Sequence, residues 1–354
     1  MIPDIKGKRV ALIGGGGFIG HNLALHLREM GAEPHIIDSL QVNNLGAFTH
    51  GLDENPNSRL YIEFINERLD MMRQGTIPLH IVDARDYQLL SRHLSGIAPD
   101  VVVQLAAVAH ANRANKDPYS TFDHSMRTLE NALDGIRDRG THFIYFSSSM
   151  VYGNFEGAAV TEDRVCEPMG IYGALKLAGE TLVKAYHQVF DLPYTIVRPS
   201  ALYGERCVSR RVGQAFIENA IRGQTVTING DGSDELDFTY IGDLVQGIVR
   251  CIARDEARNE TFNLTYGSSR SLNKMAEILK ENFPEVEVVH HPRDALMPER
   301  GTLNISKARQ LIGYEPQFPL ERGFVNYIEW YKQLAADKPG FFGLTESGRA
   351  KAAE

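Results

Sequence analysis

The sequence of 354 residues lacks the features that mark secreted, membrane and metal-binding proteins. It has only three cysteines, Cys166, Cys207 and Cys251, which lie far apart and in no metal-binding spacing. No run of eighteen apolar residues occurs, and the first ten residues, MIPDIKGKRV, lack the apolar core of a signal peptide. Reduced thiols are typical of a reducing compartment, so we expect a cytoplasmic protein with no membrane partner and no metal.

The chain also lacks a cluster of basic residues in its sequence. It carries 37 Lys and Arg against 45 Asp and Glu, a formal net charge of −8. A protein that binds nucleic acid ordinarily offers a run of Lys and Arg to the phosphates, so we expect no nucleic-acid partner. The hydrophobic content of 43% and the length instead suit a large α/β domain with a smaller one appended.

What the sequence does have is a glycine-rich motif near its start. Residues 10–38 read VALIGGGGFIGHNLALHLREMGAEPHIID: an apolar run of strand length, glycines, a helical pattern, a second apolar run and an acid. The spacing of Gly14, Gly17 and Gly20 lets the chain turn off a strand, admits a pyrophosphate to the backbone and packs the next helix closely. A glycine-rich turn without a ligand is the alternative, but the flanking pattern favours a dinucleotide site.

The acid at the end of this motif selects between two cofactors. Asp38 lies 21 residues after Gly17, where a carboxylate can accept hydrogen bonds from both ribose hydroxyls of adenosine and would repel a 2′-phosphate. We therefore expect NAD rather than NADP. Asp83 follows a later apolar run and either reaches the adenine or caps a helix. The residues expected to hold NAD are Gly14, Gly17, Phe18, Ile19, Gly20, Asp38, Asp83, Ala106, Ala107, Tyr172 and Lys176.

Further apolar runs predict the rest of a parallel sheet. Strands are expected at 79–82, 101–105 and 143–146, with helices at 59–73, 118–139 and 172–190. The connection from Asp38 to the third strand is long, and we expect its helix to pack as a surface helix on its own sheet. Later segments predict helices at 208–222, 244–254, 271–283 and 320–332 and strands at 225–229 and 286–290.

This pattern predicts a doubly wound α/β fold, a Rossmann domain, with a smaller C-terminal substrate-binding lobe. The cofactor domain is expected to span residues 1–198 with a return segment at about 236–268. The substrate lobe then comprises 199–235 and 269–334. The remaining residues, 335–354, are polar and rich in Gly and Ala, and we expect a loosely held tail.

A tyrosine and a lysine follow the fifth predicted strand. Tyr172 and Lys176 are four residues apart and so share one helix face. A tyrosine, with an ordinary pKa of about 10, becomes a useful base when a nearby ammonium and the positive nicotinamide stabilise its phenolate. Ser148, at the end of the preceding strand, can hold the substrate oxygen opposite it. The alternative is that Tyr172 and Lys176 have this spacing by chance. The strand that ends in serines just before them makes a catalytic pair the favoured interpretation.

With these residues the chain resembles the extended short-chain dehydrogenase/reductase family, the nucleotide-sugar epimerases and dehydratases, and within it the UDP-glucose and UDP-glucuronate 4-epimerases. The resemblance rests on Gly14, Gly17, Gly20, Asp38, the Ser147–Tyr152–Gly153 segment, Tyr172, Lys176 and segments at 198–204, 230–243, 305–308 and 313–316. It implies that Tyr172 is the base, that Lys176 binds the nicotinamide ribose and that Ser148 faces the substrate. It also implies a homodimer formed through the helices at 118–139 and 172–190.

The sequence departs from the family pattern at four positions. Met150 stands where dehydratases and decarboxylases carry an acid, Ala201 and Leu236 stand where epimerases carry an asparagine and a diphosphate-binding arginine, and His124 replaces another asparagine. Arg206, Arg210, Arg211 and Arg300 are then the candidates for the diphosphate. The residues expected to bind substrate are Ser149, Met150, His110, Ser200, Arg211 and Arg300.

These features predict NAD-dependent epimerisation of a nucleotide sugar, most favourably at C4 through a transient 4-keto sugar. A 4,6-dehydratase or a 4-keto reductase would use the same tyrosine and lysine and remains an alternative. A non-catalytic NAD-binding sensor is a further one, although a sensor has no use for Ser148, Tyr172 and Lys176.

Overall fold

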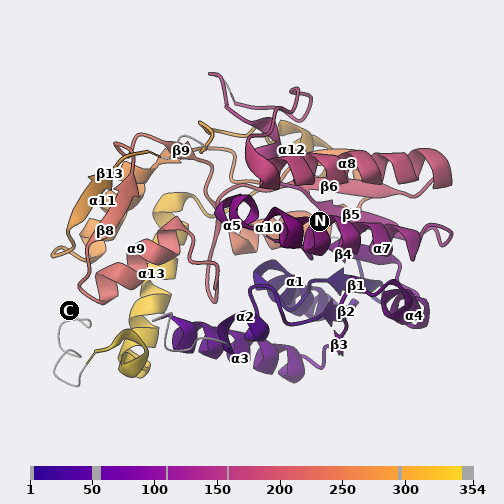
Figure 1. The fold of residues 1–354 in the computed structure, drawn as a ribbon, viewed down its shortest axis with the longest axis horizontal. Helices are drawn as coiled ribbons and strands as arrows, with labels where there is room; N and C mark the ends of the chain where they lie inside the picture. Colours follow the sequence, from indigo (N-terminus) through magenta and orange to yellow (C-terminus); the bar gives the residue numbers. More distant parts are fainter. Residues whose placement is uncertain (1–3, 50–56, 109–110, 158, 294–296, 345–354) are drawn as a thin grey trace.

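A computed structural model describes residues 4–49, 57–108, 111–157, 159–293 and 297–344 (Figure 1). Its centre is a parallel seven-stranded sheet in the order β11-β6-β5-β4-β1-β2-β3, which confirms the doubly wound fold. The strands are β1 (Arg9–Ile13), β2 (Glu33–Asp38), β3 (Leu79–Ile81), β4 (Val101–Gln104), β5 (His142–Phe146), β6 (Tyr194–Arg198) and β11 (Glu260–Asn263). Because β1 pairs with both β2 and β4, the strand order reverses beside it, where such folds form their binding crevice.

Helices cover both faces of this sheet. One face packs against α1 (Phe18–Glu29), α10 (Ile241–Ala253) and α12 (Ser306–Ile312), and the other against α4 (Tyr87–Ile97), α7 (Thr128–Asp134) and α8 (Gly170–Phe190). Val102 and Val103 of β4 are wholly buried on opposite faces, which explains why this strand reads as an unbroken apolar run. In the described parts of the chain, no helix is long and apolar enough to cross a membrane.

A second hydrophobic core lies in the smaller lobe (Figure 1). It is built from α9 (Val212–Ile221), α11 (Leu272–Asn282), α13 (Leu320–Asp337) and the parallel pair β8 (Val226–Asn229) and β13 (Val288–His291). Two further short ladders are separate from the central sheet: β7 (Leu202–Tyr203) pairs with β10 (Thr239–Tyr240), and β9 (Glu235–Leu236) pairs with β12 (Arg270–Ser271). The predicted domain bounds stay a prediction.

The beginning of the expected tail is ordered. Helix α13 runs to Asp337 instead of ending at 332, with Ala335 buried, and Phe342 is only 3% exposed. The ring of Phe342 packs against Tyr331 and under the guanidinium of Arg222. The sequence prediction was wrong for this part of the tail. Its apolar side chains are few, but Phe341, Phe342 and Leu344 pack on the lobe core.

The helix of the long connection, α3 (Ser58–Gln74), also differs from the prediction of a surface helix on its own sheet. Its apolar face, with Tyr61 and Phe64, belongs to the core of the smaller lobe. Phe64 packs against Trp330 with ring centroids 5.2 Å apart, and the Tyr61 hydroxyl donates to Glu218 at 3.0 Å. The helix therefore ties the two lobes together. A short helix, α2 (Leu45–Thr49), packs beside it.

Two other helices depart from their predicted bounds. The expected helix at 118–139 comprises α6 (Pro118–Phe122), one π-helical turn at Asp123–Arg127, and α7, which ends at Asp134 before Gly135. The helix expected from 208 begins at Val212, because the preceding loop turns through left-handed backbone at Arg206 and Arg210. A further short helix, α5 (Ala111–Lys116), packs on α8.

Candidate active site

Two adjoining cavities open at the carboxyl ends of the central strands. One, of about 130 Å³, runs along the glycine loop and the ends of β2 and β4, and the other, of about 410 Å³, lies between the sheet and the smaller lobe. They share Ile19, Leu105, Ala107 and Arg211 as walls. This is the edge at which open parallel sheets bind their ligands.

The glycine loop forms a cradle that side chains would fill. A Cβ on Gly14, which has a φ of +79°, would lie 2.5 Å from the Ala106 amide nitrogen, and one on Gly20 would lie 2.4 Å from the Gly15 Cα. Gly20 thus packs against the loop itself. Gly17 lines the smaller cavity at the start of α1, where unpaired N–H groups favour a phosphate. The cradle fits the pyrophosphate of a dinucleotide.

Asp38 lies at the end of β2 with its carboxylate fixed. One oxygen accepts from the Gly16 amide at 2.9 Å and the other from the Leu40 amide at 2.7 Å. Burial raises the pKa of this carboxyl, and the two amide hydrogen bonds oppose that rise. Each oxygen has a further lone pair and Asp38 lines the cavity, so the site suits a donor such as a ribose hydroxyl and disfavours a phosphate.

Changing Asp38 to Asn is expected to lower the preference for NAD over NADP by tenfold or more, since about tenfold corresponds to 1.4 kcal/mol of lost repulsion. Calorimetric titration of the apoprotein with each cofactor measures the ratio. Asp86→Asn is the control, because Asp86 is an exposed acid whose side chain only caps α4. Equal affinity of the parent chain for NAD and NADP would contradict the role assigned to Asp38.

Asp83 lines the same cavity, but its helix-cap interpretation was wrong. Its carboxylate is held by the Arg85 guanidinium at 2.6 Å and accepts the Arg85 amide at 2.9 Å, while Asp86 caps α4. The Arg85 hydrogen bonds hold the pKa of the Asp83 carboxyl below its usual range. Contact with adenine stays a prediction for Asp83. Phe18, Ile19, Ala106 and Ala107 line the cavity as well.

Ser148, Tyr172 and Lys176 converge on the larger cavity. Ser148 follows β5, and the other two lie one turn apart at the start of α8, with the Lys176 ammonium 6.0 Å from the Tyr172 ring centroid. The ammonium donates to the Phe146 carbonyl at 2.6 Å. Burial lowers the pKa of Lys176 to about 8, although the Glu180 carboxylate opposes this.

Besides Lys176, the Arg211 guanidinium acts on Tyr172 in this structure. Burial raises the pKa of the Tyr172 phenol, and the Arg211 guanidinium and a hydrogen bond to Ser148 lower it. Arg211 precedes α9 and reaches back over both cavities. The sequence pattern suggested Arg211 as a phosphate ligand and gave no sign that it faces the tyrosine.

The other predicted substrate residues fall into three groups. Ser149, Met150, Ser200, Arg211 and Arg300 line the larger cavity, together with Ala201 and Leu236. Arg206 and Arg210 do not line it, since they pair with Glu67 and Glu218. His124 borders the cofactor cavity, and His110 lies outside the described residues.

Arg211 and Arg300 are the cations left for an anionic ligand. Both have a buried Nε atom that meets no hydrogen-bond acceptor in the described parts of the chain. Burial and the repulsion of Arg211 lower the pKa of Arg300 to about 10. Two guanidinium groups that repel each other, each with a buried Nε that has no acceptor among the described residues, favour the entry of a phosphate or carboxylate between them.

Two buried groups behind the site escaped the sequence analysis. Glu180, one turn after Lys176, accepts from Ser147 at 2.5 Å and pairs with Arg198 at 2.6 Å; its i+4 spacing from Lys176 was the available signal. Arg68 of α3 is fully buried and donates from Nε to the Arg206 carbonyl at 3.1 Å. It holds the loop that ends in Arg211. The only signal in the sequence was a single arginine on the apolar face of the predicted helix.

Comparisons with known proteins agree with this geometry. The model of the NAD dependent epimerase/dehydratase family matches residues 10–265. An uncharacterized UDP-glucose epimerase of Bacillus subtilis is 30% identical over 250 residues, 69% of this chain and 78% of that protein. A putative UDP-glucose 4-epimerase of Methanocaldococcus jannaschii is 28% identical over 332 residues, 91% of this chain and 98% of its own.

A solved structure is similar over nearly the whole chain. It is a Tyr-to-Phe variant of UDP-glucuronic acid 4-epimerase from Bacillus cereus, in complex with NAD and UDP-4-deoxy-4-fluoro-glucuronic acid. The TM-score is 0.79 at 26% identity, with 92% of this chain and 99% of that chain covered. The glycine cradle, the fixed Asp38 and the extent of these matches lead to one conclusion: the chain belongs to the NAD dependent epimerase/dehydratase family.

Proposed function

We propose that this protein epimerises a nucleotide sugar at C4. The observation that carries the proposal is the convergence of Ser148, Tyr172 and Lys176 on one cavity that adjoins the glycine cradle. NAD is the cofactor of the family, and when bound it supplies a reversible acceptor for the hydrogen on C4. The similarity to UDP-sugar 4-epimerases supports the proposal.

Each residue then has a distinct task. Tyr172 takes the proton of the C4 hydroxyl, and Ser148, hydrogen-bonded to it, holds the same oxygen. Lys176, fixed on the Phe146 carbonyl, is placed to bind the nicotinamide ribose and to add positive charge beneath the phenol. A 4-keto sugar that turns over in the cavity and is reduced on its other face gives the epimer with no net oxidation.

Arg300 and Arg211 are proposed to bind the acidic part of the substrate. Leu236 and Ala201 line the cavity, but neither can bind the diphosphate as the arginine and asparagine expected at these positions would. The Nε atoms of the two arginines are buried and have no acceptor within the described segments, which supports this replacement. The nucleotide is expected to lie farther out, against Thr227 and Asn229 of β8.

A 4,6-dehydratase is the second candidate within the family. It must remove the C5 proton and expel the C6 hydroxyl, which needs an acid and a base beside the tyrosine. Met150 occupies that position, and its thioether can do neither. A 4-keto reductase and a non-catalytic NAD-binding sensor remain further alternatives, and they differ from an epimerase in consuming reduced cofactor or in showing no turnover.

A panel of UDP- and dTDP-sugars incubated in D₂O and followed by NMR distinguishes these activities. We expect one pair of sugars to reach equilibrium with no deuterium on carbon, because a 4-epimerase exchanges no carbon-bound hydrogen with water. Mass spectrometry should show no loss of water, and absorbance no net NADH. Deuterium at C5 or C6 with loss of water would identify a dehydratase, and stoichiometric NADH consumption a reductase.

We further propose that the protein is a homodimer. Tyr119 and Phe122 of α6 and Val189 of α8 expose 86%, 52% and 71% of their surface, although they are large and apolar. These helices are the ones expected to pair across a two-fold axis. Light scattering at micromolar concentration should give twice the chain mass of 39.5 kDa, and a monomer would contradict the proposal. A cytoplasmic location stays a prediction.

A further inference from the structure

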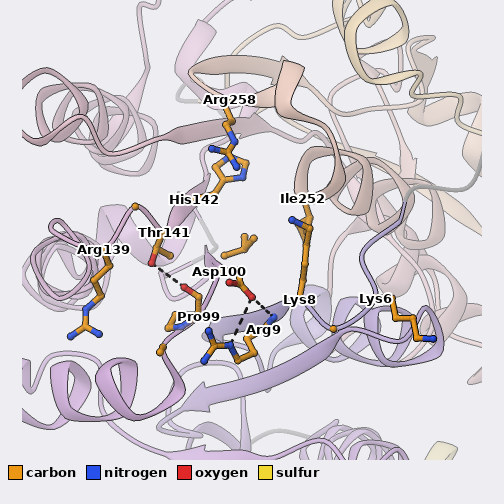
Figure 2. Close-up of a pocket in the computed structure, with 14 residues that line it drawn as sticks. Lys6, Lys8, Arg9, Pro99, Asp100, Arg139, Thr141, His142, Ile252 and Arg258 are labelled. Carbon is orange, nitrogen blue, oxygen red and sulfur yellow. Dashed lines mark hydrogen bonds and ion pairs between the residues drawn. The ribbon is translucent and has the colours of Figure 1, made fainter.

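A third cavity lies at the opposite edge of the sheet from the active site. It has a volume of about 530 Å³ and opens at the amino ends of β1, β4 and β5 (Figure 2). The first residues of these strands, Arg9, Val101 and His142, line it. This volume is within the range of small-molecule sites. Nothing in the proposed reaction uses it, because the glycine cradle and Tyr172 lie at the carboxyl ends of the same strands.

The walls of this cavity carry mainly positive charge. Lys6, Lys8, Arg9, Arg139 and Arg258 line it, against the single carboxylate of Asp100. Such a concentration is unexpected on a chain with a net charge of −8. Asp100 is already occupied, since it accepts the Arg9 amide at 2.8 Å and pairs with the Arg9 guanidinium at 3.9 Å.

Cations are often found at the carboxyl ends of helices, where they interact with the helix dipole, but this accounts for only part of the positive charge around the cavity. Arg9 donates to the Ile97 carbonyl at the end of α4, which is the expected use of a cation there. Arg139 donates to the Ser95 hydroxyl, and Arg258 pairs with Asp255, an acid that is 91% exposed. Lys6 and Lys8 pair with no carboxylate in the described parts of the chain.

Two of these cations face one buried imidazole. Figure 2 shows the Arg258 guanidinium beside His142, on the side of the cavity away from the Arg9–Asp100 pair. Burial, and after it Arg258 and Lys8, lower the pKa of His142 to about 4, while Asp255 opposes them. The imidazole donates to or accepts from the Thr195 hydroxyl at 2.8 Å, so it is a fixed neutral wall and not itself a ligand.

We propose that this cavity is a second ligand site, which binds a di- or triphosphate group through Lys8 and Arg258, with Lys6 and Arg139 at its rim. Phosphate suits the site because guanidinium and ammonium groups bind its oxygens with charge-assisted hydrogen bonds. No aromatic ring other than His142 lines the cavity in the described structure, so the phosphates and not a stacked base provide the recognition. The proposal is independent of the reaction at Tyr172.

Titration calorimetry of the full chain with inorganic triphosphate, at constant ionic strength, tests it. We expect saturation at one equivalent, with affinity about tenfold or more weaker in Lys8→Glu and in Arg258→Gln, a loss typical of one charge-assisted contact. Arg127→Glu is the matched control, because among the described residues Arg127 pairs only with Glu130, and both side chains are about half exposed. Arg300→Met tests whether the active site binds the triphosphate instead.

The proposal is wrong if triphosphate shows no saturable binding. It is also wrong if Arg127→Glu weakens triphosphate binding as much as Lys8→Glu does, or if Arg300→Met abolishes that binding while Lys8→Glu does not. A second readout is the His142 imidazole in NMR spectra, whose pKa should rise when the anion offsets Lys8 and Arg258; an unmoved His142 would place the anion elsewhere. UDP and ADP distinguish the sources. If the site accepts nucleotides, Lys8→Glu should bind one equivalent of UDP or ADP fewer than the parent chain. If it accepts only free polyphosphate, Lys8→Glu and the parent chain should bind the same number of equivalents of UDP or ADP.

Discussion

Replacing Tyr172 by Phe is expected to reduce turnover by about 10²–10⁴-fold, the range attributed to a general acid–base group. The variant loses one hydroxyl and the hydrogen bond to Ser148, while the ring and its packing on α8 remain. We therefore expect the fold and the bound NAD to be retained. The measurement is kcat for the sugar pair identified in D₂O, together with NAD released per chain after denaturation.

Tyr186→Phe is the matched control for this variant. Tyr186 lies on the same helix, only partly buried, and lines neither cavity of the active site. It should keep full activity. If Tyr172→Phe also stays within tenfold of the parent chain, Tyr172 is not the base.

The pH profile offers an additional check on the same residue. The base must be deprotonated, so kcat/KM rises as pH increases through the pKa of Tyr172. Because the Arg211 guanidinium lowers that pKa, Arg211→Met should move the rising limb to higher pH.

Replacing Glu180 by Gln is expected to lower the free energy of unfolding by about 3–5 kcal/mol, the cost of leaving one member of a buried ion pair alone. The side chains of Glu180 and Arg198 are 1% and 4% exposed, and two guanidinium nitrogens donate to the carboxylate at 2.8 and 2.6 Å. Gln keeps the shape but not the charge, and its amide offers one acceptor oxygen where the carboxylate offers two. One of the two guanidinium nitrogens would then face an NH2 group, and the buried Arg198 would lose its counter-ion.

Urea unfolding followed by circular dichroism measures this loss. Arg127→Gln is the control, because Arg127 and Glu130 are about half exposed and such pairs contribute about 0–1 kcal/mol. A change at Glu180 no larger than at the control would show that the buried pair does not stabilise the fold. Because Glu180 also accepts from Ser147, beside Ser148, some loss of turnover should accompany the loss of stability.

The parts of the fold that were predicted from sequence are those in which local pattern decides the structure. The strand, glycine loop, helix and acid of residues 9–38 have fixed spacings, and Tyr172 and Lys176 are neighbours on one helix, so both motifs could be recognised without knowing the rest. The parts that were missed depend on distant partners. Helix α3 shows its apolar face in the sequence, but Trp330 and Tyr331, the aromatic residues that pack on its Phe64, lie more than 250 positions later.

The same distinction separates the site residues. Arg211 and Arg300 were two of four candidates, and only the fold shows that Arg206 and Arg210 turn to Glu67 and Glu218. The cause is the loop before α9, in which Arg206 and Arg210 adopt the left-handed backbone although neither is a glycine. Arg68 could not be assigned at all, because its partner is a backbone carbonyl, which sequence does not distinguish.

The position of α3 has a consequence for how the chain folds during synthesis. Leu60, Tyr61 and Phe64 leave the ribosome long before Trp330, Tyr331 and Phe342, with which they share a core. Contacts between segments so distant in sequence cost loop-closure entropy and form slowly. A nascent chain ending near 198 would therefore display an unpartnered apolar helix beside its finished cofactor loop. We expect such a fragment to bind chaperones or aggregate, so that the two lobes become native together, at the end of translation.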